Sequence, residues 1–169
     1  MINIRLAEES DLAELSEIEK QADKIFVEHG IDIGNDETQS IDTLNDALRN
    51  KRLWVAEDGD ELVGFSLVIL INENAHLEQV SVLPRMQKQG IGAKLVKATI
   101  DWAQQNNYER ITLSTFNDVP WNQNFYAKLG FRDIPSNELD KTLKDLRSTE
   151  ARLGLDITKR VFMAYTIDN

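Results

Sequence analysis

Two glycines separated by a single residue, Gly90 and Gly92, stand directly before a segment with helical hydrophobic spacing. Glycine lets a backbone turn tightly and approach a ligand without interference from a Cβ atom. The first turn of the following helix would direct its free N–H groups, and the positive end of its dipole, at the same point. Such a loop is a general binding site for phosphate and other anions.

The charge of the chain is distributed unevenly around this loop. The net charge is −10, from 29 acidic and 19 basic residues, which argues against nucleic acids or anionic membranes as partners. The segment from Gln79 to Ile100 nevertheless contains no Asp or Glu, and it includes four basic residues, Arg85, Lys88, Lys94 and Lys97. A solvated helix face would explain this pattern, and so would a local site for an anionic ligand.

Two familiar phosphate-binding motifs do not fit the loop. A Walker A motif needs Gly-Lys-Ser or Gly-Lys-Thr, whereas the run here is Gly92-Ala93-Lys94-Leu95. A dinucleotide fingerprint needs a third glycine where Leu95 stands. A nucleotide-phosphate enzyme therefore remains only a weak alternative.

The elements that must position this loop follow from hydrophobic periodicity, which predicts a mixed α/β fold in one domain spanning residues 1–169. Strands are expected at Ile2–Leu6, Leu53–Glu57, Leu62–Ile71, Ala75–Leu83, Arg110–Thr115, Gly130–Ile134 and Thr158–Ile167. Helices are expected at Leu12–Phe26 with Ser10 as N-cap, Ser40–Arg49, Ile91–Ala103, Trp121–Leu129 and Ser136–Leu153. The early strands form hairpins, whereas the strand–helix–strand unit of residues 75–115 needs a crossover, so its two strands should run parallel.

The composition limits the classes of protein that are possible. The 169 residues are 41% hydrophobic, which is enough for one buried core. The chain contains no Cys, so we expect neither disulfides nor a cysteine metal site. We find no signal peptide and no apolar run of membrane-spanning length, and we expect a cytoplasmic protein without a membrane partner.

Two spaced motifs resemble those of a known superfamily. The pattern Gln87-x-x-Gly90-x-Gly92, after a strand that ends at Pro84, resembles the Q/R-x-x-G-x-G/A signature of GNAT N-acetyltransferases. The segment from Phe125 to Phe131, FYAKLGF, is similar to the F/L-Y-x-x-x-G-F segment of the same superfamily. The resemblance covers nearly the whole chain and implies a mostly antiparallel central sheet with one parallel, splayed strand pair and helices on both faces.

The resemblance implies acetyl-CoA as co-substrate, with no metal. Backbone N–H groups from Gln89 to Ala93 would hold its pyrophosphate, with help from Arg85, Lys88 and Lys94. The pantetheine arm would pair with the strand near Val80 and Val82, and a backbone N–H near Val80 would stabilise the oxyanion. The implied cofactor-binding residues are Val80, Val82, Gln87, Lys88, Gln89, Gly90, Ile91, Gly92, Ala93, Asn122 and Tyr126.

Acetyl transfer to an amine requires a general base, and the resemblance offers two candidates. Glu78 matches the strand glutamate that acts as base in the superfamily, often through water. His76 lies two residues earlier on the same strand face, and its reference pKa near 6.5 suits a base better. Either residue, or a relay of both, would fit, and a charge on a solvated strand end is the alternative for Glu78.

The second motif implies a general acid and a ligand contact. Tyr126 would protonate the departing thiolate of CoA, and Asn122, four residues earlier, would hydrogen-bond the pantetheine amides. Many members carry Asn seven residues before the tyrosine, but this chain has Val119 there. The side-chain amide that those members carry at this position is therefore absent here.

Acceptor specificity in the superfamily comes from the first two helices, the loop between them and the strand hairpins. Asp32, Asp36 and Glu37 crowd that loop, which would suit a cationic amine or would simply keep the loop soluble. Phe26 and Trp54 either line the site or belong to the core. The segment 136–153 would cover the acceptor site or pack a homodimer.

The sequence therefore predicts an N-acetyltransferase that acts on a small, cationic primary amine by direct attack in a ternary complex. The absence of Cys excludes a cysteine acyl-enzyme. Two alternatives remain open: a protein lysine or N-terminal acetyltransferase, and a non-catalytic acyl-CoA-binding regulatory module.

Overall fold

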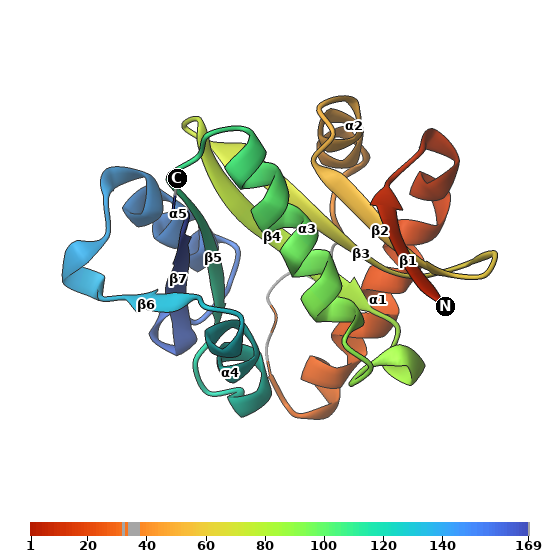
Figure 1. Ribbon diagram of the computed structural model, residues 1–169. Coiled ribbons are helices and arrows are strands. Elements are labelled where there is room, and N and C mark those ends of the chain that lie inside the picture. The colour runs from red at the N-terminus through yellow and green to blue at the C-terminus, as the bar shows by residue number, and fades with distance from the viewer. Residues whose placement is uncertain (32, 34–37, 169) are drawn as a thin grey trace.

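A single seven-stranded sheet forms the centre of the molecule, with the strands in the order β1-β2-β3-β4-β5-β7-β6 (Figure 1). The computed structural model describes residues 1–31, 33 and 38–168. The strands are β1 Ile2–Leu6, β2 Leu53–Asp58, β3 Glu61–Ile71, β4 Asn74–Val82, β5 Arg110–Phe116, β6 Arg132–Ile134 and β7 Arg160–Thr166. The predicted mixed α/β fold is confirmed.

Helices cover both faces of the sheet, as predicted. They are α1 Leu12–Glu28, α2 Ile41–Arg49, α3 Ile91–Gln105, α4 Pro120–Lys128 and α5 Lys141–Arg152. Figure 1 shows α3 in front of the sheet, where it contacts β2, β3 and β4, and α1 behind it, where it contacts β3 and β4. α2 contacts β2 and β3, and α4 contacts β5.

The parallel strand pair expected from the crossover is β4 with β5. Every other strand pair in the described part of the chain is antiparallel. The parallel pair has a single register match, His76 with Thr112, and Figure 1 shows the two strands diverging from there toward their carboxyl ends. The predicted splayed pair is therefore present.

A β-bulge interrupts β4 at Glu78. Val68 of β3 pairs with Leu77, and the next residue, Leu67, pairs with Gln79, so Glu78 is the extra residue in the ladder. A bulge re-aims the side chains that follow it and is common beside active sites.

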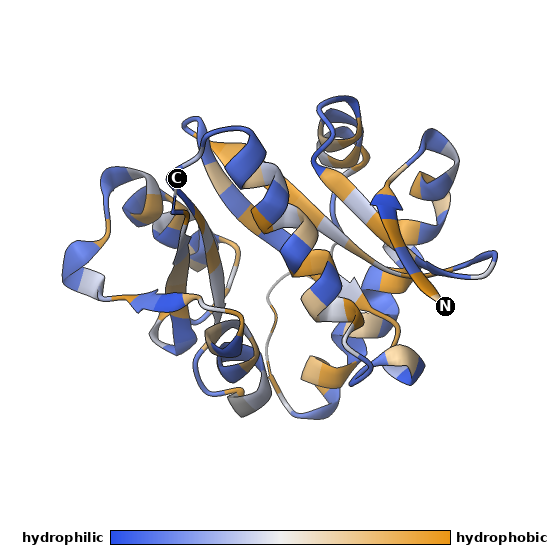
Figure 2. Cartoon of the chain, in the orientation of Figure 1, coloured by the Kyte–Doolittle hydropathy of each residue, from blue (hydrophilic) through white to orange (hydrophobic). Residues whose placement is uncertain are grey.

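The hydrophobic core lies between the sheet and its helices. Figure 2 shows hydrophobic residues running along the central strands and alternating in bands with hydrophilic ones on the helices. α3 buries Ile91, Leu95, Val96 and Ala103 against the sheet, as its helical spacing predicts. A second, smaller cluster of Leu139, Leu143 and Phe162 holds the segment before β7 against the sheet.

Two predicted helix starts are wrong. Ser10 is not an N-cap, because it lies inside a 3-10 turn, Glu9–Asp11, that Glu8 and Asp11 close with a capping box. The predicted helix at 136–153 is also interrupted. Residues Ser136–Glu138 form a separate 3-10 turn, and α5 begins only after Asp140, whose carboxylate accepts a hydrogen bond from the Leu143 N–H at 2.9 Å.

Candidate active site

The glycine loop forms the open N-terminus of α3. Gly90 is the N-cap residue, with a φ angle of 80° in the left-handed region that favours glycine. The first helical bond runs from the Lys94 N–H to the Gly90 carbonyl at 3.1 Å. By helix geometry, the N–H groups of Ile91, Gly92 and Ala93 then have no acceptor within the helix and point out of its end.

The two glycines are needed for different reasons. A Cβ atom on Gly90 would meet nothing within 4 Å, so the requirement for glycine at this position is conformational. A Cβ atom on Gly92 would lie 3.2 Å from Cζ of Phe125, which is a tight contact. Gly92 and Phe125 come from the two motifs of the sequence, so the structure brings these motifs together.

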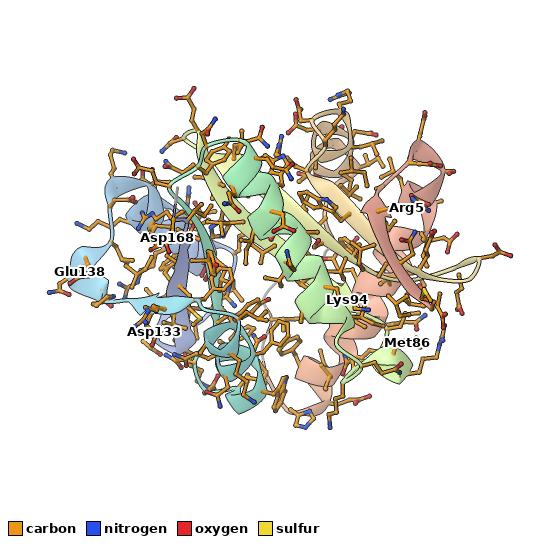
Figure 3. The ribbon with its side chains drawn as sticks, in the orientation of Figure 1. Arg5, Met86, Lys94, Asp133, Glu138 and Asp168 are labelled. Atoms are coloured by element: carbon orange, nitrogen blue, oxygen red, sulfur yellow. The ribbon has the colours of Figure 1, made fainter. Side chains whose placement is uncertain are left out.

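Two of the four cations in the acid-free segment are already paired. Arg85 pairs with Glu61, and the Lys97 ammonium lies 2.8 Å from the Asp101 carboxylate. Lys88 and Lys94 are exposed, and neither has an ion-pair partner among the described residues. Figure 3 shows Lys94 on the first turn of α3 and Met86 on the turn that precedes the loop. Lys88 and Lys94 are therefore the cations best placed to meet an anionic ligand.

α4 presents the side chains of the second motif. The Asn122 amide nitrogen donates to the Thr115 hydroxyl on β5, so one of its two donor hydrogens is engaged within the protein. The ring of Tyr126 packs edge-on against Phe125 and Phe131, with ring centroids 5.0 and 5.8 Å apart. Burial raises the pKa of Tyr126 to about 12, against a lowering effect of the Arg160 charge, so its hydroxyl stays protonated at neutral pH.

The two candidate bases lie side by side but differ in environment. His76 is buried, with 3% exposure, and its Nδ1 atom lies 2.8 Å from the Thr112 hydroxyl oxygen. Burial, with a smaller effect of the Arg160 charge, lowers the pKa of His76 to about 4. The Glu78 side chain keeps 31% of its surface exposed, yet burial of its carboxylate raises its pKa to about 7.

The bulge at Glu78 reverses the alternation of side chains along β4, so that residues before and after it with the same spacing face opposite sides of the sheet. Val80 pairs with Ser66, whose hydroxyl donates to the Leu95 carbonyl on α3 at 3.4 Å, so Val80 faces α3. Glu78 faces α1, where its charge raises the pKa of Glu19. Strict alternation along a strand would have placed both side chains on one face.

Glu19 is a component of the site that the sequence analysis missed. Its side chain comes from α1 and is buried, and its Oε2 atom accepts a hydrogen bond from the Gln39 backbone N–H at 2.9 Å. Burial raises the pKa of Glu19 to about 7. The side chain of Gln39 in turn lowers the pKa of Glu78 by hydrogen bonding. A signal was present, because Glu19 lies on the apolar face of its helix beside Leu15, Ile18 and Ala22, which are also buried.

A buried ion pair on the same face was also missed. The Arg160 Nε atom at the start of β7 donates to Oε1 of Glu150 on α5 at 3.1 Å. The same carboxylate oxygen accepts a hydrogen bond from the Ser114 hydroxyl of β5 at 3.0 Å. No local pattern marks this pair, since its members meet only through the tertiary fold.

An open groove of about 800 Å³ lies beside Glu78. Its wall includes Gln39 and two acidic residues of α2, Asp42 and Asp46. Of the two aromatic residues considered for the acceptor site, Trp54 is buried in the core, and the ring of Phe26 packs on Phe116 at 5.8 Å. Asp32, Asp36 and Glu37 are outside the described residues.

The described residues contain no group of three or more His, Cys, Asp or Glu side chains that could hold a metal ion. No helix in this part of the chain is long and apolar enough to cross a membrane.

Comparison with known proteins identifies the family. Residues 14–131, well over half of the chain, match the sequence model of the acetyltransferase (GNAT) family. The chain belongs to the GNAT family. This confirms the resemblance read from the two motifs, and the acyltransferase class expected from them agrees with it.

The individual relatives share only a modest fraction of their residues with this chain. A thialysine N-epsilon-acetyltransferase of Mus musculus is 30% identical over 88 residues, which cover 47% of this chain and 50% of that protein. The match thus spans about half the length of this curated relative. A GNAT-family acetyltransferase of Staphylococcus aureus superposes with a TM-score of 0.75 at 23% identity, covering 99% of this chain and all of that one.

A further solved structure is an N-acetylglutamate synthase of Neisseria gonorrhoeae complexed with coenzyme A and N-acetyl-glutamate. It superposes with a TM-score of 0.73 at 20% identity and covers 100% of this chain but 36% of that one. At these identities the two superpositions establish the fold of this GNAT protein and nothing more specific.

Proposed function

We propose that this GNAT protein transfers the acetyl group of acetyl-CoA to a primary amine of a small molecule, by direct attack with both substrates bound. The observation that carries the proposal is the bulge at Glu78. It directs Val80 toward α3 and Glu78 toward α1. The two substrates would therefore approach the splayed strands from opposite faces and meet between them.

The α3 face would hold acetyl-CoA, which supplies the reactive thioester. The N–H groups of Ile91, Gly92 and Ala93 would bind the pyrophosphate, with Lys88 and Lys94 adding positive charge. Gln87 and Gln89 complete the loop, and Val80 and Val82 would contact the pantetheine arm. Asn122 keeps one amide hydrogen and its carbonyl oxygen for the same ligand.

Glu78 is the better candidate for the base. A primary amine resembling that of lysine has a pKa near 10.4, so it arrives mostly protonated and must lose a proton. A general base works best when its pKa is near the operating pH, and the pKa of Glu78 is raised to about 7. His76, with a pKa lowered to about 4 and a ring nitrogen held at Thr112, would position Glu78 instead.

Tyr126 would act as the general acid. Its pKa of about 12 keeps the hydroxyl protonated, and a neutral phenol can donate a proton or a hydrogen bond to a departing thiolate. Its place on α4, beside Phe125 and the glycine loop, puts it on the acetyl-CoA side of the splayed strands.

A small acceptor is supported by two relatives, whose names mention thialysine and N-acetyl-glutamate. Asp46 forms an ion pair with Arg52, which also lines the groove, so Asp42 and Glu78 leave the wall net acidic. This charge favours a cationic amine over an anionic one. A protein lysine or N-terminal amine remains the alternative acceptor, and a homodimer remains a proposal from the family resemblance.

The test is release of free thiol from acetyl-CoA at pH 8, with polyamines, aminoglycosides, amino acids and lysine peptides as separate classes of acceptor. Turnover above the rate without acceptor, confined to small amines, supports the proposal. Turnover with the lysine peptides alone would assign the protein to the macromolecular alternative. Saturable acetyl-CoA binding without turnover of any class would instead support a regulatory module.

A further inference from the structure

We propose that Arg160 binds a carboxylate of the acceptor, so that the acceptor is an amino acid rather than a plain amine. This inference rests on the proposed function, because it names the class of molecule that the same site would take. It assigns a specificity-determining role to a residue that neither motif contains.

Arg160 lies on the acceptor face of the sheet. As the first residue of β7 it pairs with Phe116 of β5, and its guanidinium carbon lies 4.5 Å from the centre of the Phe116 ring. Its positive charge lowers the pKa of His76, Glu78 and Tyr126. The geometry agrees with this, because Arg160 bonds Glu150, which accepts from Ser114. Ser114 lies two residues along β5 from Thr112, the partner of His76, and therefore faces the same side of the sheet.

The guanidinium is held in place while most of its N–H donors form no hydrogen bond among the described residues. An arginine side chain has five N–H donors, and Arg160 uses its Nε–H for Glu150 at 3.1 Å. Glu150 is itself fixed by Ser114, and the Glu150 and Arg160 side chains are 9% and 14% exposed. Among the described residues no further hydrogen bond to Arg160 is formed, so its terminal Nη groups remain for a ligand.

A carboxylate is the ligand that this arrangement fits best. The planar Nη groups of arginine match a carboxylate with two parallel hydrogen bonds. Confinement between Phe116 and Glu150 orders the side chain in advance, which reduces the entropy lost on binding. Phosphate, with its greater charge, would be repelled more strongly by the nearby carboxylates of Glu150 and Glu78.

An amino acid satisfies both kinds of charge in the site. Its amine would meet Glu78 and its carboxylate would meet Arg160, so that one small molecule bridges the carboxylate of Glu78 and the guanidinium of Arg160. A plain amine would leave Arg160 without a partner beyond Glu150. The site would therefore discriminate against amines that lack a carboxylate.

The experiment compares matched acceptors in the intact protein and in Arg160→Gln. The pairs are L-lysine with cadaverine, L-ornithine with putrescine, and L-phenylalanine with 2-phenylethylamine. We expect the wild type to prefer each amino acid, and Arg160→Gln to raise its KM about ten-fold or more while the KM of the matched amine changes less than about two-fold. Arg160→Lys should recover part of the loss, and Arg132→Gln, on the exposed surface of β6, is the control.

A binding measurement makes the test independent of turnover. Nα-acetyl-L-phenylalanine and N-(2-phenylethyl)acetamide are titrated against the protein with CoA present, and binding is followed by calorimetry. Stronger binding of the carboxylate compound that disappears in Arg160→Gln supports the inference, even if no acceptor is turned over and the proposed function fails.

Other outcomes would overturn the inference without contradicting the proposed function. Turnover of plain amines at the same KM as the amino acids would show that no carboxylate is recognised. An equal loss for both members of a pair in Arg160→Gln would show a structural role. If Arg160→Gln does not fold, as judged by circular dichroism, Arg160→Lys decides, and equal KM changes for both members of a pair count against the inference.

Discussion

The Nε2 atom of His76 lies 3.8 Å from Oε2 of Glu78, while its Nδ1 atom lies 2.8 Å from the Thr112 hydroxyl oxygen. Thr112 is also the register partner of His76, at the single match between the splayed strands. The histidine ring therefore lies beside both the proposed base and the point from which the strands diverge. A distance of 3.8 Å exceeds that of a hydrogen bond, so the ring and the carboxylate meet directly only if one of them moves, or through a water molecule.

Replacement of the proposed base should reduce turnover strongly. We expect Glu78→Gln to lower kcat by about 10²- to 10⁴-fold, because the amide cannot accept the proton of the acceptor. The KM for acetyl-CoA should change little, since Glu78 lies on the opposite face from the glycine loop. The measurement is thiol release at saturating acetyl-CoA, with Glu138→Gln, an exposed residue far from Lys94 in Figure 3, as control. Unchanged turnover in Glu78→Gln would show that Glu78 is not the general base.

The same carboxylate should determine the pH profile. The pKa of Glu78 is raised to about 7, and only its deprotonated form accepts a proton. On a logarithmic plot against pH, the slope of kcat/KM should therefore fall by about one as the pH rises through about 7. Glu78→Gln should lose this change of slope while any slope from the acceptor amine remains. A change of slope that survives in Glu78→Gln would belong to another group.

Stability should depend on pH through Glu19. Burial raises the pKa of Glu19 from 4.5 to about 7, so the fold favours the protonated form. Its contribution to stability is fully present below about pH 4.5 and is lost as the pH rises through about 7. Glu19→Gln, which can still accept the Gln39 N–H, should therefore gain on the order of 2 kcal/mol at pH 8 and almost nothing at pH 4.

Urea denaturation of the two proteins at both pH values measures this difference. Glu14→Gln, an exposed residue on the same helix, is the matched control and should leave stability unchanged. The same gain for Glu19→Gln at pH 4 and pH 8 would show that the charge of Glu19 is not the cause.

The sequence predicted what depends on local pattern. Hydrophobic periodicity and residues close in the chain were enough to predict the hairpins of the early strands, the crossover helix and the glycine turn. The bulge at Glu78 does not, because strand alternation alone would put Val80 on the same face as Glu78. The contact between Glu150 and Arg160 likewise depends on how α5 packs against β7, through Leu139, Leu143 and Phe162. Polar pairs of this kind require the tertiary structure.

Removal of the Tyr126 hydroxyl should slow the release of CoA thiol. We expect Tyr126→Phe to lower kcat by about 10²-fold, because the departing thiolate would lose its proton donor. The ring packing against Phe125 and Phe131 should persist, so the melting temperature and the KM for acetyl-CoA should stay close to wild type. Tyr108→Phe, whose ring stacks on Trp102 at 5.1 Å, is the control for loss of a tyrosine hydroxyl elsewhere. A wild-type rate in Tyr126→Phe would show that Tyr126 is not the general acid.

The contact between Gly92 and Phe125 should couple the two motifs. The Cβ atom of Gly92→Ala would lie 3.2 Å from Cζ of Phe125, so the Phe125 ring must give by a few tenths of an ångström. We expect α4, which carries Tyr126, to shift with this ring. A small displacement of a positioning group is costly, so kcat/KM for acetyl-CoA should fall about ten-fold or more. The second change Phe125→Leu shortens the side chain that is struck, and the double variant should recover much of this loss.

Gly90→Ala provides the matched comparison. Its Cβ atom meets nothing within 4 Å, but its φ angle of 80° is strained for alanine, at a cost of about 1–2 kcal/mol of stability. Phe125→Leu should not relieve that strain, because no side chain causes it. Kinetics on the two single variants and the two double variants therefore separate a steric contact from a conformational requirement. Equal rescue of both glycine variants by Phe125→Leu would contradict the different roles assigned to the two glycines.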